Sequence, residues 1–150
     1  TVDNIEDKLN DVAGVRVICS FVDDIYTVAE MLARQDDINV LMVKDYIRCP
    51  KVNGYRSYHM IIEVPVFFSD RKENMRVEVQ IRTIAMDFWA SLDHQMKYKK
   101  DVEDASEISE ELKECAEVIA QTDLKMLSLR RKIEDRESKE NLLQFDKDPM

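Results

Sequence analysis

The amino-acid sequence predicts an α+β fold, a mixed β-sheet flanked by helices, with a long helix at its C-terminal end. Segments rich in β-branched and aromatic residues alternate with helical patterns in the order strand, helix, strand, loop, hairpin, helix. A seven-residue apolar repeat begins near residue 106 and predicts one long helix. The chain has 150 residues, 45% of them hydrophobic, which is enough to enclose one core.

The first part of the predicted fold is a strand, helix and strand. Residues 3–10 are expected to form a short helix, and residues 15–21 form a strand because they are rich in β-branched and aromatic side chains. Asp23 and Asp24 are placed to cap the next helix. The apolar side of that helix has the i, i+3, i+4, i+7 spacing and consists of Ile25, Val28, Ala29 and Leu32. Residues 38–47 return as a second strand.

A loop and a hairpin follow. Residues 48–57 contain a proline, an asparagine and a glycine and are expected to form a loop. Residues 58–68 form a strand, and Pro65 places part of it at an edge or a bulge. After a polar turn, residues 75–83 pair back as the second arm. Side chains alternate along this arm, and its polar face carries Arg76, Glu78, Gln80 and Arg82. A solvated outer face is the ordinary alternative.

Two helices complete the predicted fold. Residues 84–98 form a helix whose expected core side is Ala85, Phe88, Trp89, Leu92 and Met96. The long helix carries residues at spacings of four and three, namely Ile108, Leu112, Cys115, Ile119, Thr122, Met126, Leu129 and Ile133. This seam fits a coiled coil between subunits and fits equally a helix packed on its own domain. We place the domain at residues 1–136 and expect residues 137–150 to form a polar, frayed tail.

Charge is distributed unevenly along the chain. Twenty-two basic and 31 acidic residues give a net charge of −9, which argues against a general nucleic-acid binder and against DNA as a partner. Residues 44–100 nevertheless carry 11 basic and 7 acidic side chains, a net of +4, which indicates a local anionic ligand. Chance clustering of surface charge is the alternative.

No apolar run approaches the roughly 18 residues of a membrane span. Three scattered cysteines suit a reducing cytoplasm.

Few side chains are arranged for catalysis. The sequence has no Gly-rich phosphate loop, and its two histidines, His59 and His94, are too few for a multi-histidine metal site. Asp11 precedes the first strand, and Glu78 lies on the polar face of the last. Two carboxylates from different strands can hold Mg²⁺ when they meet. Such an ion would neutralise charge on a phosphoryl group in transfer.

The segment from Pro50 to His59 mixes cations, aromatic rings, hydroxyls and a glycine. Tyrosine rings can stack on a nucleobase, and Lys and Arg can clamp phosphates. An ordinary polar loop has a similar composition, so this segment taken by itself leaves both interpretations open.

Four segments carry a family resemblance. They are Asp-Val-Ala-Gly-Val-Arg-Val at 11–17, Asp-Tyr-Ile at 45–47 leading into the loop at 51–59, Val-Glu-Val-Gln-Ile-Arg-Thr at 77–83, and Met-Asp-Phe-Trp-Ala at 86–90. Together they resemble the synthetase domain of the RelA/SpoT family, in particular the small alarmone synthetases. The resemblance covers about residues 8–100 in the same order. Several motifs at matching spacing make it specific.

The resemblance implies a nucleotidyltransferase-like sheet and a GTP pyrophosphokinase. Such an enzyme transfers pyrophosphate from ATP to the 3′-hydroxyl of GTP or GDP, giving AMP and (p)ppGpp, the alarmone of the stringent response. The resemblance implies that Asp11 and Glu78 hold Mg²⁺ and that Glu78 is also the base for the attacking hydroxyl. It further implies that Tyr55 stacks on guanine and that Arg16 packs on adenine. The implied guanine-nucleotide pocket also contains Lys51, His59 and Gln80.

The sequence departs from the family pattern in three respects. Asp87 stands where some relatives carry Asn, and an acid there could accept hydrogen bonds from the N1–H and amino group of guanine. The basic ATP-binding motif that the family carries upstream of Asp11 is not in this sequence. No His-Asp dipeptide of the family's hydrolase domain occurs, so a synthetase alone is implied. Small relatives form homotetramers, which the seven-residue repeat would support.

Two other interpretations stay open on the sequence. A non-catalytic guanine-nucleotide sensor would keep the pocket but would not need paired metal carboxylates. An oligomeric scaffold built on the long helix would not be stabilised by nucleotides. A role in binding single-stranded RNA gains no support from the net charge of −9.

Overall fold

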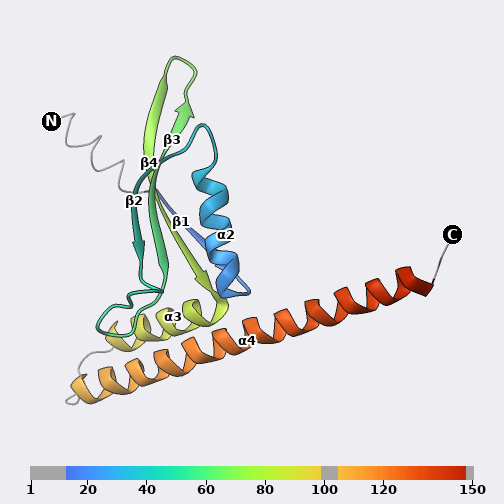
Figure 1. Ribbon diagram of the computed structural model, residues 1–150. Helices are drawn as coiled ribbons and strands as arrows, with labels where there is room; N and C mark the ends of the chain where they lie inside the picture. The colour runs from blue at the N-terminus through green and yellow to red at the C-terminus, as the bar shows by residue number, and fades with distance from the viewer. Residues whose placement is uncertain (1–12, 99–104, 148–150) are drawn as a thin grey trace.

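A mixed four-stranded sheet, one helix on its face and two helices across its end make up the computed structural model (Figure 1), which describes residues 13–98 and 105–147. The strands are β1 (Ala13–Cys19), β2 (Asn39–Asp45), β3 (Tyr58–Phe67) and β4 (Lys72–Thr83). The helices are α2 (Val22–Ala33), α3 (Ile84–Tyr98) and α4 (Ala105–Lys147). The predicted α+β fold with a long C-terminal helix is confirmed. The helix expected at 3–10 lies outside the described residues.

The strand order is β1-β4-β3-β2, with β1 parallel to β4 and the other pairs antiparallel. The β3–β4 hairpin extends past the end of the other strands (Figure 1). Pro65 pairs with Asn74 on β4 and lies beyond Glu63, where the pairing of β3 with β2 stops. Its missing N–H therefore costs no ladder bond to β2, and the predicted edge position is confirmed.

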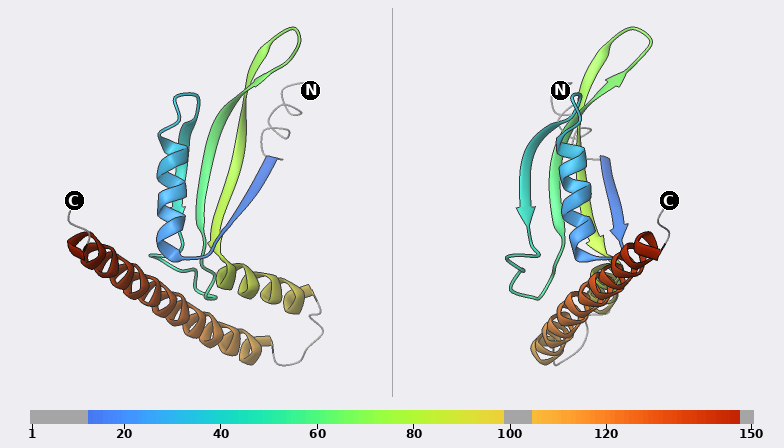
Figure 2. Two further views of the ribbon diagram at one scale, coloured as in Figure 1. Left: turned by 90° about the vertical axis from the view of Figure 1, so that its right-hand side faces the viewer. Right: turned by 45° about the vertical axis from the view of Figure 1, so that its right-hand side comes forward.

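The core lies between the sheet and α2, which runs along one face (Figure 2). Ile25 and Ala29 of α2 are buried against alternating side chains of the two central strands, which are Met60, Ile62, Val79 and Ile81. Burying a side chain of this size contributes about 1.5–3 kcal/mol. Because α2 covers one face only, polar side chains on the other face remain accessible.

The expected capping of α2 by Asp23 and Asp24 is wrong. Phe21 is the N-cap residue and makes no side-chain capping bond. Both aspartates lie in the first turn, where a negative charge is favoured by the helix dipole. Their carboxylates also accept hydrogen bonds from α4, Asp24 from Arg130 at 3.0 Å and Asp23 from Arg131 at 2.8 Å. Contacts with a distant helix, which local spacing does not reveal, replace the cap.

Helix α3 begins and ends at the predicted residues, and its buried face is partly as predicted. Trp89 is buried as expected, and Met86 is buried as well, whereas Phe88 and Met96, which were expected on the core side, are exposed. The indole N–H of Trp89 donates to the carbonyl of Leu112 on α4 at 2.8 Å. Contact with α4 as well as the sheet therefore sets which side of α3 faces inward.

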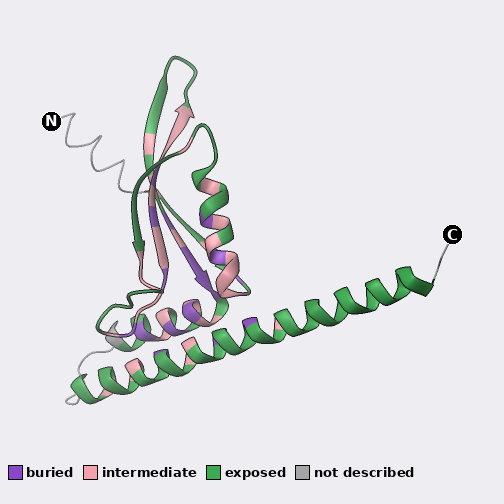
Figure 3. Cartoon of the chain, in the orientation of Figure 1, coloured by how far each residue is buried: buried purple, intermediate pink, exposed green. Residues whose placement is uncertain are grey.

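Helix α4 packs on the domain up to Arg130 and Arg131, which pair with α2, and the part that follows is exposed (Figure 3). Ala116, Asp123 and Leu127 are its buried residues, on a stripe beside the predicted seam. The later seam residues Met126 and Leu129 are exposed, at 51% and 45%. The fraying expected from residue 137 is wrong, because the helix continues to Lys147, although residues 131–147 are all exposed. Within the described part of the chain, no helix is long and apolar enough to span a membrane.

Candidate active site

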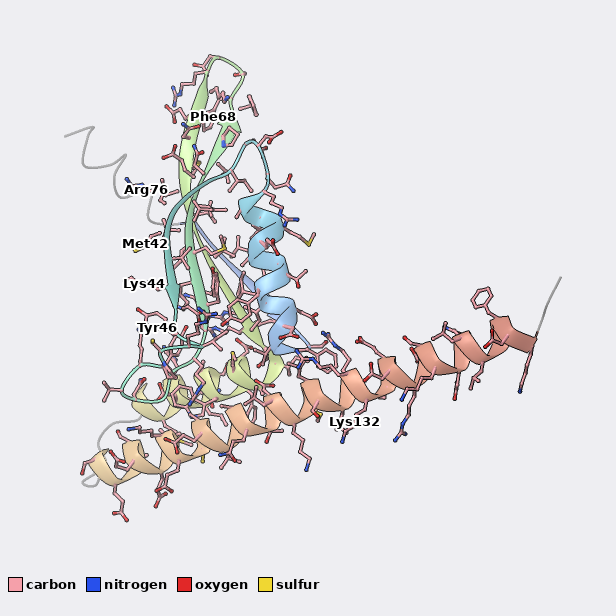
Figure 4. The ribbon with its side chains drawn as sticks, in the orientation of Figure 1. Met42, Lys44, Tyr46, Phe68, Arg76 and Lys132 are labelled. Carbon is pink, nitrogen blue, oxygen red and sulfur yellow. The ribbon has the colours of Figure 1, made fainter. Side chains whose placement is uncertain are left out.

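Side chains from all four strands meet on the sheet face opposite α2. Strand register joins four polar residues in one row across the sheet, namely Lys44, His59, Gln80 and Arg16. The next row on the same side of the sheet, two residues further along each strand, consists of Met42, Ile61, Glu78 and Gly14. Paired residues point to the same side of a sheet, and Figure 4 shows Met42 and Lys44 on the side of β2 away from α2. We call this surface the open face. It brings together the predicted site residues Arg16, His59, Glu78 and Gln80.

The loop between β2 and β3 holds Lys51 and Tyr55 at the end of this face. Gly54 has a φ of +98°, which glycine adopts readily because it has no Cβ. Its N–H donates to the carbonyl of Lys51 at 2.9 Å, and the N–H of Lys51 donates to the carbonyl of Tyr55 at 3.1 Å. Asn53 Oδ1 accepts a hydrogen bond from the N–H of Tyr55 at 3.0 Å. These bonds fix the loop backbone at both predicted residues.

Tyr46, Tyr55 and His59 form an aromatic cluster next to the loop. Their rings meet edge to face, with centroids 5.1 Å apart for Tyr46 and His59 and 5.7 Å apart for Tyr55 and His59. The Nζ atom of Lys51 lies 4.9 Å from the centroid of the Tyr46 ring and 5.1 Å from that of Tyr55. Flat rings beside a cation suit both the base and the phosphates of a nucleotide.

Glu78 provides a negative charge in the middle of the open face. Its side chain is 49% exposed, and its Oε1 accepts a hydrogen bond from Gln80 Nε2 at 3.2 Å. His59 Nδ1 lies 3.5 Å from the same oxygen. Burial lowers the pKa of His59 below its usual value, with help from Arg82, Lys51 and Lys44, although Glu78 opposes the shift. His59 is therefore neutral at pH 7 and does not neutralise the Glu78 carboxylate.

Arg82 lies at the end of β4, beneath the loop, and only 5% of it is exposed. Its Nη2 donates to the Tyr55 hydroxyl at 2.8 Å and also to Gln80 Oε1. Its Nε donates to Ser57 Oγ at 3.3 Å, and its Nη1 donates to Asp87 Oδ1 at 3.1 Å. One guanidinium thus contacts three of the predicted site residues.

Asp87 connects the two sides of the site. The Oδ1 atom that accepts from Arg82 also lies 3.5 Å from Arg16 Nη1. Asp87 stands near the start of α3, so this helix brings the carboxylate to the two arginines. The predicted adenine-side residue and the predicted guanine-side residues are therefore joined through one carboxylate.

Two neighbouring cavities open on this surface and share Arg16. The smaller, about 240 Å³, is lined by Gly14, Val15, Arg16, Glu78 and Gln80. The larger, about 530 Å³, lies between Tyr55, Arg82 and the outer side of α3, where Ala90 and His94 line it. One cavity thus presents a carboxylate and the other an aromatic ring. The surface can accommodate two ligands side by side with Arg16 between them.

The structure describes one of the two carboxylates that were predicted to hold Mg²⁺. Asp11 lies outside the described residues, so its distance from Glu78 is not part of the structure. Glu78 fits a hard cation, because it is a half-exposed carboxylate at the edge of a cavity. Among residues 13–98 and 105–147, no cluster of three or more His, Cys, Asp or Glu side chains is placed to hold a metal. A metal bound here would depend on Glu78, on Asp11 and on oxygen atoms of the substrate.

Arg82 and Tyr46 are the two site residues that the sequence prediction leaves out. Alternation along β4 places Arg82 on the polar face of its strand, and this alternation was the one signal in the sequence that Arg82 belongs to the site. Its burial depends on the loop and on α3, which cover that end of β4. Tyr46 follows β2 directly, and its ring joins the cluster because the chain turns there, with its N–H donating to the carbonyl of Ser57 at 2.9 Å.

Comparison with known proteins gives one consistent result. Residues 2–103 match a family described as a region found in RelA / SpoT proteins. The chain is 47% identical over 134 residues to the GTP pyrophosphokinase YwaC of Bacillus subtilis, an overlap that covers 89% of this chain. That overlap is 64% of the relative, so the chain spans less than two thirds of the relative's length.

Two solved structures share both fold and sequence with the chain. Small alarmone synthetase 2 from Bacillus subtilis has a TM-score of 0.78 and 45% identity, covering 88% of this chain and 77% of that one. Small alarmone synthetase 1 from the same organism, bound to its product pppGpp, has a TM-score of 0.78 and 36% identity, covering 89% and 68%.

Proposed function

The chain belongs to the RelA/SpoT family, and we propose that it transfers pyrophosphate from ATP to the 3′-hydroxyl of GTP or GDP, making (p)ppGpp and releasing AMP. One observation carries the proposal. The open face has two adjacent cavities, one with the Glu78 carboxylate and one with the Tyr55 ring, and Arg16 lines both. Two nucleotides that react with each other need such an arrangement.

The guanine nucleotide occupies the larger cavity in this proposal. Its base stacks on Tyr55, while Lys51 binds its phosphates. Asp87, near the start of α3, accepts hydrogen bonds from the N1–H and amino group of guanine. The remaining pocket residues are His59 and Gln80, whose row leads from the loop toward Glu78.

ATP occupies the smaller cavity, with Arg16 against the adenine ring. The 3′-oxygen of the guanine nucleotide attacks the β-phosphorus of ATP, the bond from that phosphorus to the α–β bridging oxygen breaks, and AMP leaves. Glu78 accepts the proton of the attacking hydroxyl. Mg²⁺ held by Glu78 and Asp11 would neutralise negative charge on the phosphates.

The proposal also covers the bounds of the domain, the oligomeric state and the cellular compartment. We place the synthetase domain at residues 1–136, since Arg130 and Arg131 make ion pairs with α2 and the described residues after them, 132–147, are exposed. The exposed stripe of α4 supports a homo-oligomer, proposed as a tetramer. Cys19, Cys49 and Cys115 are free thiols, as expected for a protein of the reducing cytoplasm.

The test is AMP release from ATP that depends on GTP and Mg²⁺. The wild-type chain is expected to release AMP only when a guanine nucleotide is present, and Glu78→Gln should lower the rate by about 100-fold or more. Glu73→Gln, an exposed carboxylate on the same strand, is the matched control and should retain the rate. A sensor would bind GTP without AMP release, and a scaffold would bind neither nucleotide. Turnover by Glu78→Gln above a tenth of wild type would contradict the role of this residue.

A further inference from the structure

We propose that Arg82 is a positioning residue for the guanine nucleotide, fixing Tyr55 and Gln80 in their binding geometry before the nucleotide arrives. This inference rests on the proposed function, because it takes the cavity beside Tyr55 as the guanine site. Arg82 borders the larger cavity but is almost fully buried. Its guanidinium contacts the side chains of Tyr55 and Gln80.

The burial of this guanidinium is the first argument. A charge removed from water is costly unless it is paired and its donors are satisfied. Asp87 supplies the opposite charge at 3.1 Å, and Ser57, Tyr55 and Gln80 supply three neutral acceptors. Nε, Nη1 and Nη2 all therefore have partners, and the planar group has little freedom to turn.

The direction of the hydrogen bonds is the second argument. Arginine can only donate, so the Tyr55 oxygen accepts from Nη2. The Tyr55 hydroxyl hydrogen is then available to His59 Nε2, which lies 2.8 Å from the same oxygen. Arg82 thereby orients the tyrosine from its hydroxyl end and, through it, the imidazole.

The location of the contacts is the third argument. Tyr55 belongs to the loop, Gln80 to β4 and Asp87 to α3, so Arg82 joins three elements that approach the cavity from different directions. A fixed ring and a fixed amide need less ordering when a ligand binds, which improves its affinity. Among the described residues, the contact that leads from Arg82 to Arg16 runs through Asp87, which lies 3.5 Å from an exposed arginine side chain. The guanine side should therefore depend on Arg82 more strongly than the adenine side.

The experiment compares Arg82→Lys, Tyr55→Phe and the double variant. Lysine keeps the charge but lacks the planar fork that contacts several acceptors at once. We expect Arg82→Lys to raise the GTP dissociation constant and the KM for GTP about tenfold or more, as for a lost hydrogen bond to a charged group. The KM for ATP should change by less than about threefold. Tyr55→Phe keeps the ring and should raise the KM for GTP about three- to tenfold, through loss of one hydrogen bond.

The double variant separates positioning from a general structural effect. Because both changes remove the same contact, the double variant should be no more than about twofold worse for GTP than Arg82→Lys alone. Arg76→Lys, on the same strand and the same face but exposed, is the matched control and should match wild type. Equal losses for ATP and GTP, additive losses in the double variant, or unchanged GTP binding by Arg82→Lys would overturn the proposal.

Three further outcomes are informative. If Arg82→Lys does not fold, Tyr55→Phe decides alone, and an unchanged GTP affinity in that variant overturns the proposal. If the wild-type chain binds GTP but forms no product, the proposed function fails, while calorimetric dissociation constants still test Arg82. A wild-type chain that binds no guanine nucleotide would overturn both.

Discussion

At the residue scale, the fold accommodates the charges of the open face in two ways. Glu78 remains half exposed, and its neighbour His59 is neutral at pH 7 because burial lowers the pKa of the imidazole. Arg82 is buried, and its charge is balanced by Asp87 and three neutral acceptors. The exposed charge is free to take part in chemistry, whereas the buried one holds other side chains in place.

Tyr55→Ala should weaken GTP and GDP binding far more than ATP binding. Stacking of a base on an aromatic ring contributes about 1–3 kcal/mol by alanine substitution, or roughly 5- to 150-fold in affinity. Calorimetric titration with each nucleotide measures the effect. Phe68→Ala, an exposed aromatic residue on the β3–β4 hairpin (Figure 4), is the control and should bind both nucleotides normally. Equal losses for ATP and GTP would mean that Tyr55 has a structural role.

Asp123→Asn should change how stability depends on pH. Burial raises the pKa of Asp123, although the hydrogen bond from Thr83 Oγ1 at 2.6 Å opposes the shift. The native state therefore binds the proton more tightly than the unfolded chain, whose aspartate pKa is about 3.9. The resulting stabilisation is complete below that pH and is lost as the pH rises through the native pKa.

Because the amide introduced by Asp123→Asn does not titrate, the difference in Tm, variant minus wild type, should become more positive as the pH rises above about 4. Thermal unfolding at a series of pH values measures it. Asp135→Asn changes an exposed residue of the same helix and should show little difference at any pH. A constant difference for Asp123→Asn would contradict the expected burial cost.

At the element scale, the first half of α4 supports the active-site loop. Gly54 is buried against this helix, and a Cβ built at Gly54 would lie 2.9 Å from the Cβ of Ala116. Asp123 of α4 accepts a hydrogen bond from Thr83, directly after Arg82, and Thr83 Oγ1 accepts from the N–H of Met86 at 3.1 Å. One helix thus stabilises both the loop and the end of β4.

Gly54→Ala should destabilise the protein by more than about 1 kcal/mol, because it places a Cβ at positive φ and too close to α4. GTP binding should weaken with it, since the loop carries Lys51 and Tyr55. Chemical unfolding and GTP titration measure the two effects. Gly14→Ala is the matched control for stability, because the nearest atom to its built Cβ is 4.0 Å away. Wild-type stability in Gly54→Ala would show that the loop can shift away from α4.

The exposed stripe of α4 that holds Met126 and Leu129 carries the proposed subunit contact. Met126→Glu together with Leu129→Glu should give a smaller particle that remains folded, because both residues are half exposed within one chain and charges in a subunit interface would be left unpaired. Light scattering and circular dichroism measure size and folding. Leu124→Glu, exposed on another side of the helix, should keep the wild-type size. Unfolding of the double variant, or an unchanged oligomer, would contradict the assignment.

At the scale of the whole molecule, local patterns predict the elements better than their packing. The bounds of α3 and the polar face of β4 follow from spacing and alternation, and they are confirmed. The parallel pairing of β1 with β4 was not predictable from spacing, because the two strands are far apart in the sequence. The buried stripe of α4 was misplaced because Ala116 is small and Asp123 is charged, so neither stands out in an apolar pattern. Ala116 is buried beside Gly54 of the loop, and Asp123 accepts a hydrogen bond from Thr83.

In the candidate site, too, local patterns predict which residues belong together but not how they pack. Alternation and the resemblance together indicate Glu78, Gln80 and the loop, and the structure brings them to one face. Arg82 was identified as polar but not as buried, since its burial requires the loop and α3 to close over the end of β4. The network around Arg82 depends on contacts between residues that are distant in sequence, which a pattern along the chain does not contain.

The identity of the phosphorylated product tests the central claim most directly. The chain is incubated with ATP, GTP and Mg²⁺, and the products are separated and examined by mass spectrometry and ³¹P NMR. We expect a guanosine nucleotide with a pyrophosphate on its 3′-oxygen, formed with one AMP for each product molecule, and the absence of both in Glu78→Gln. Formation of ADP or inorganic phosphate in place of AMP, or AMP release without GTP, would contradict it.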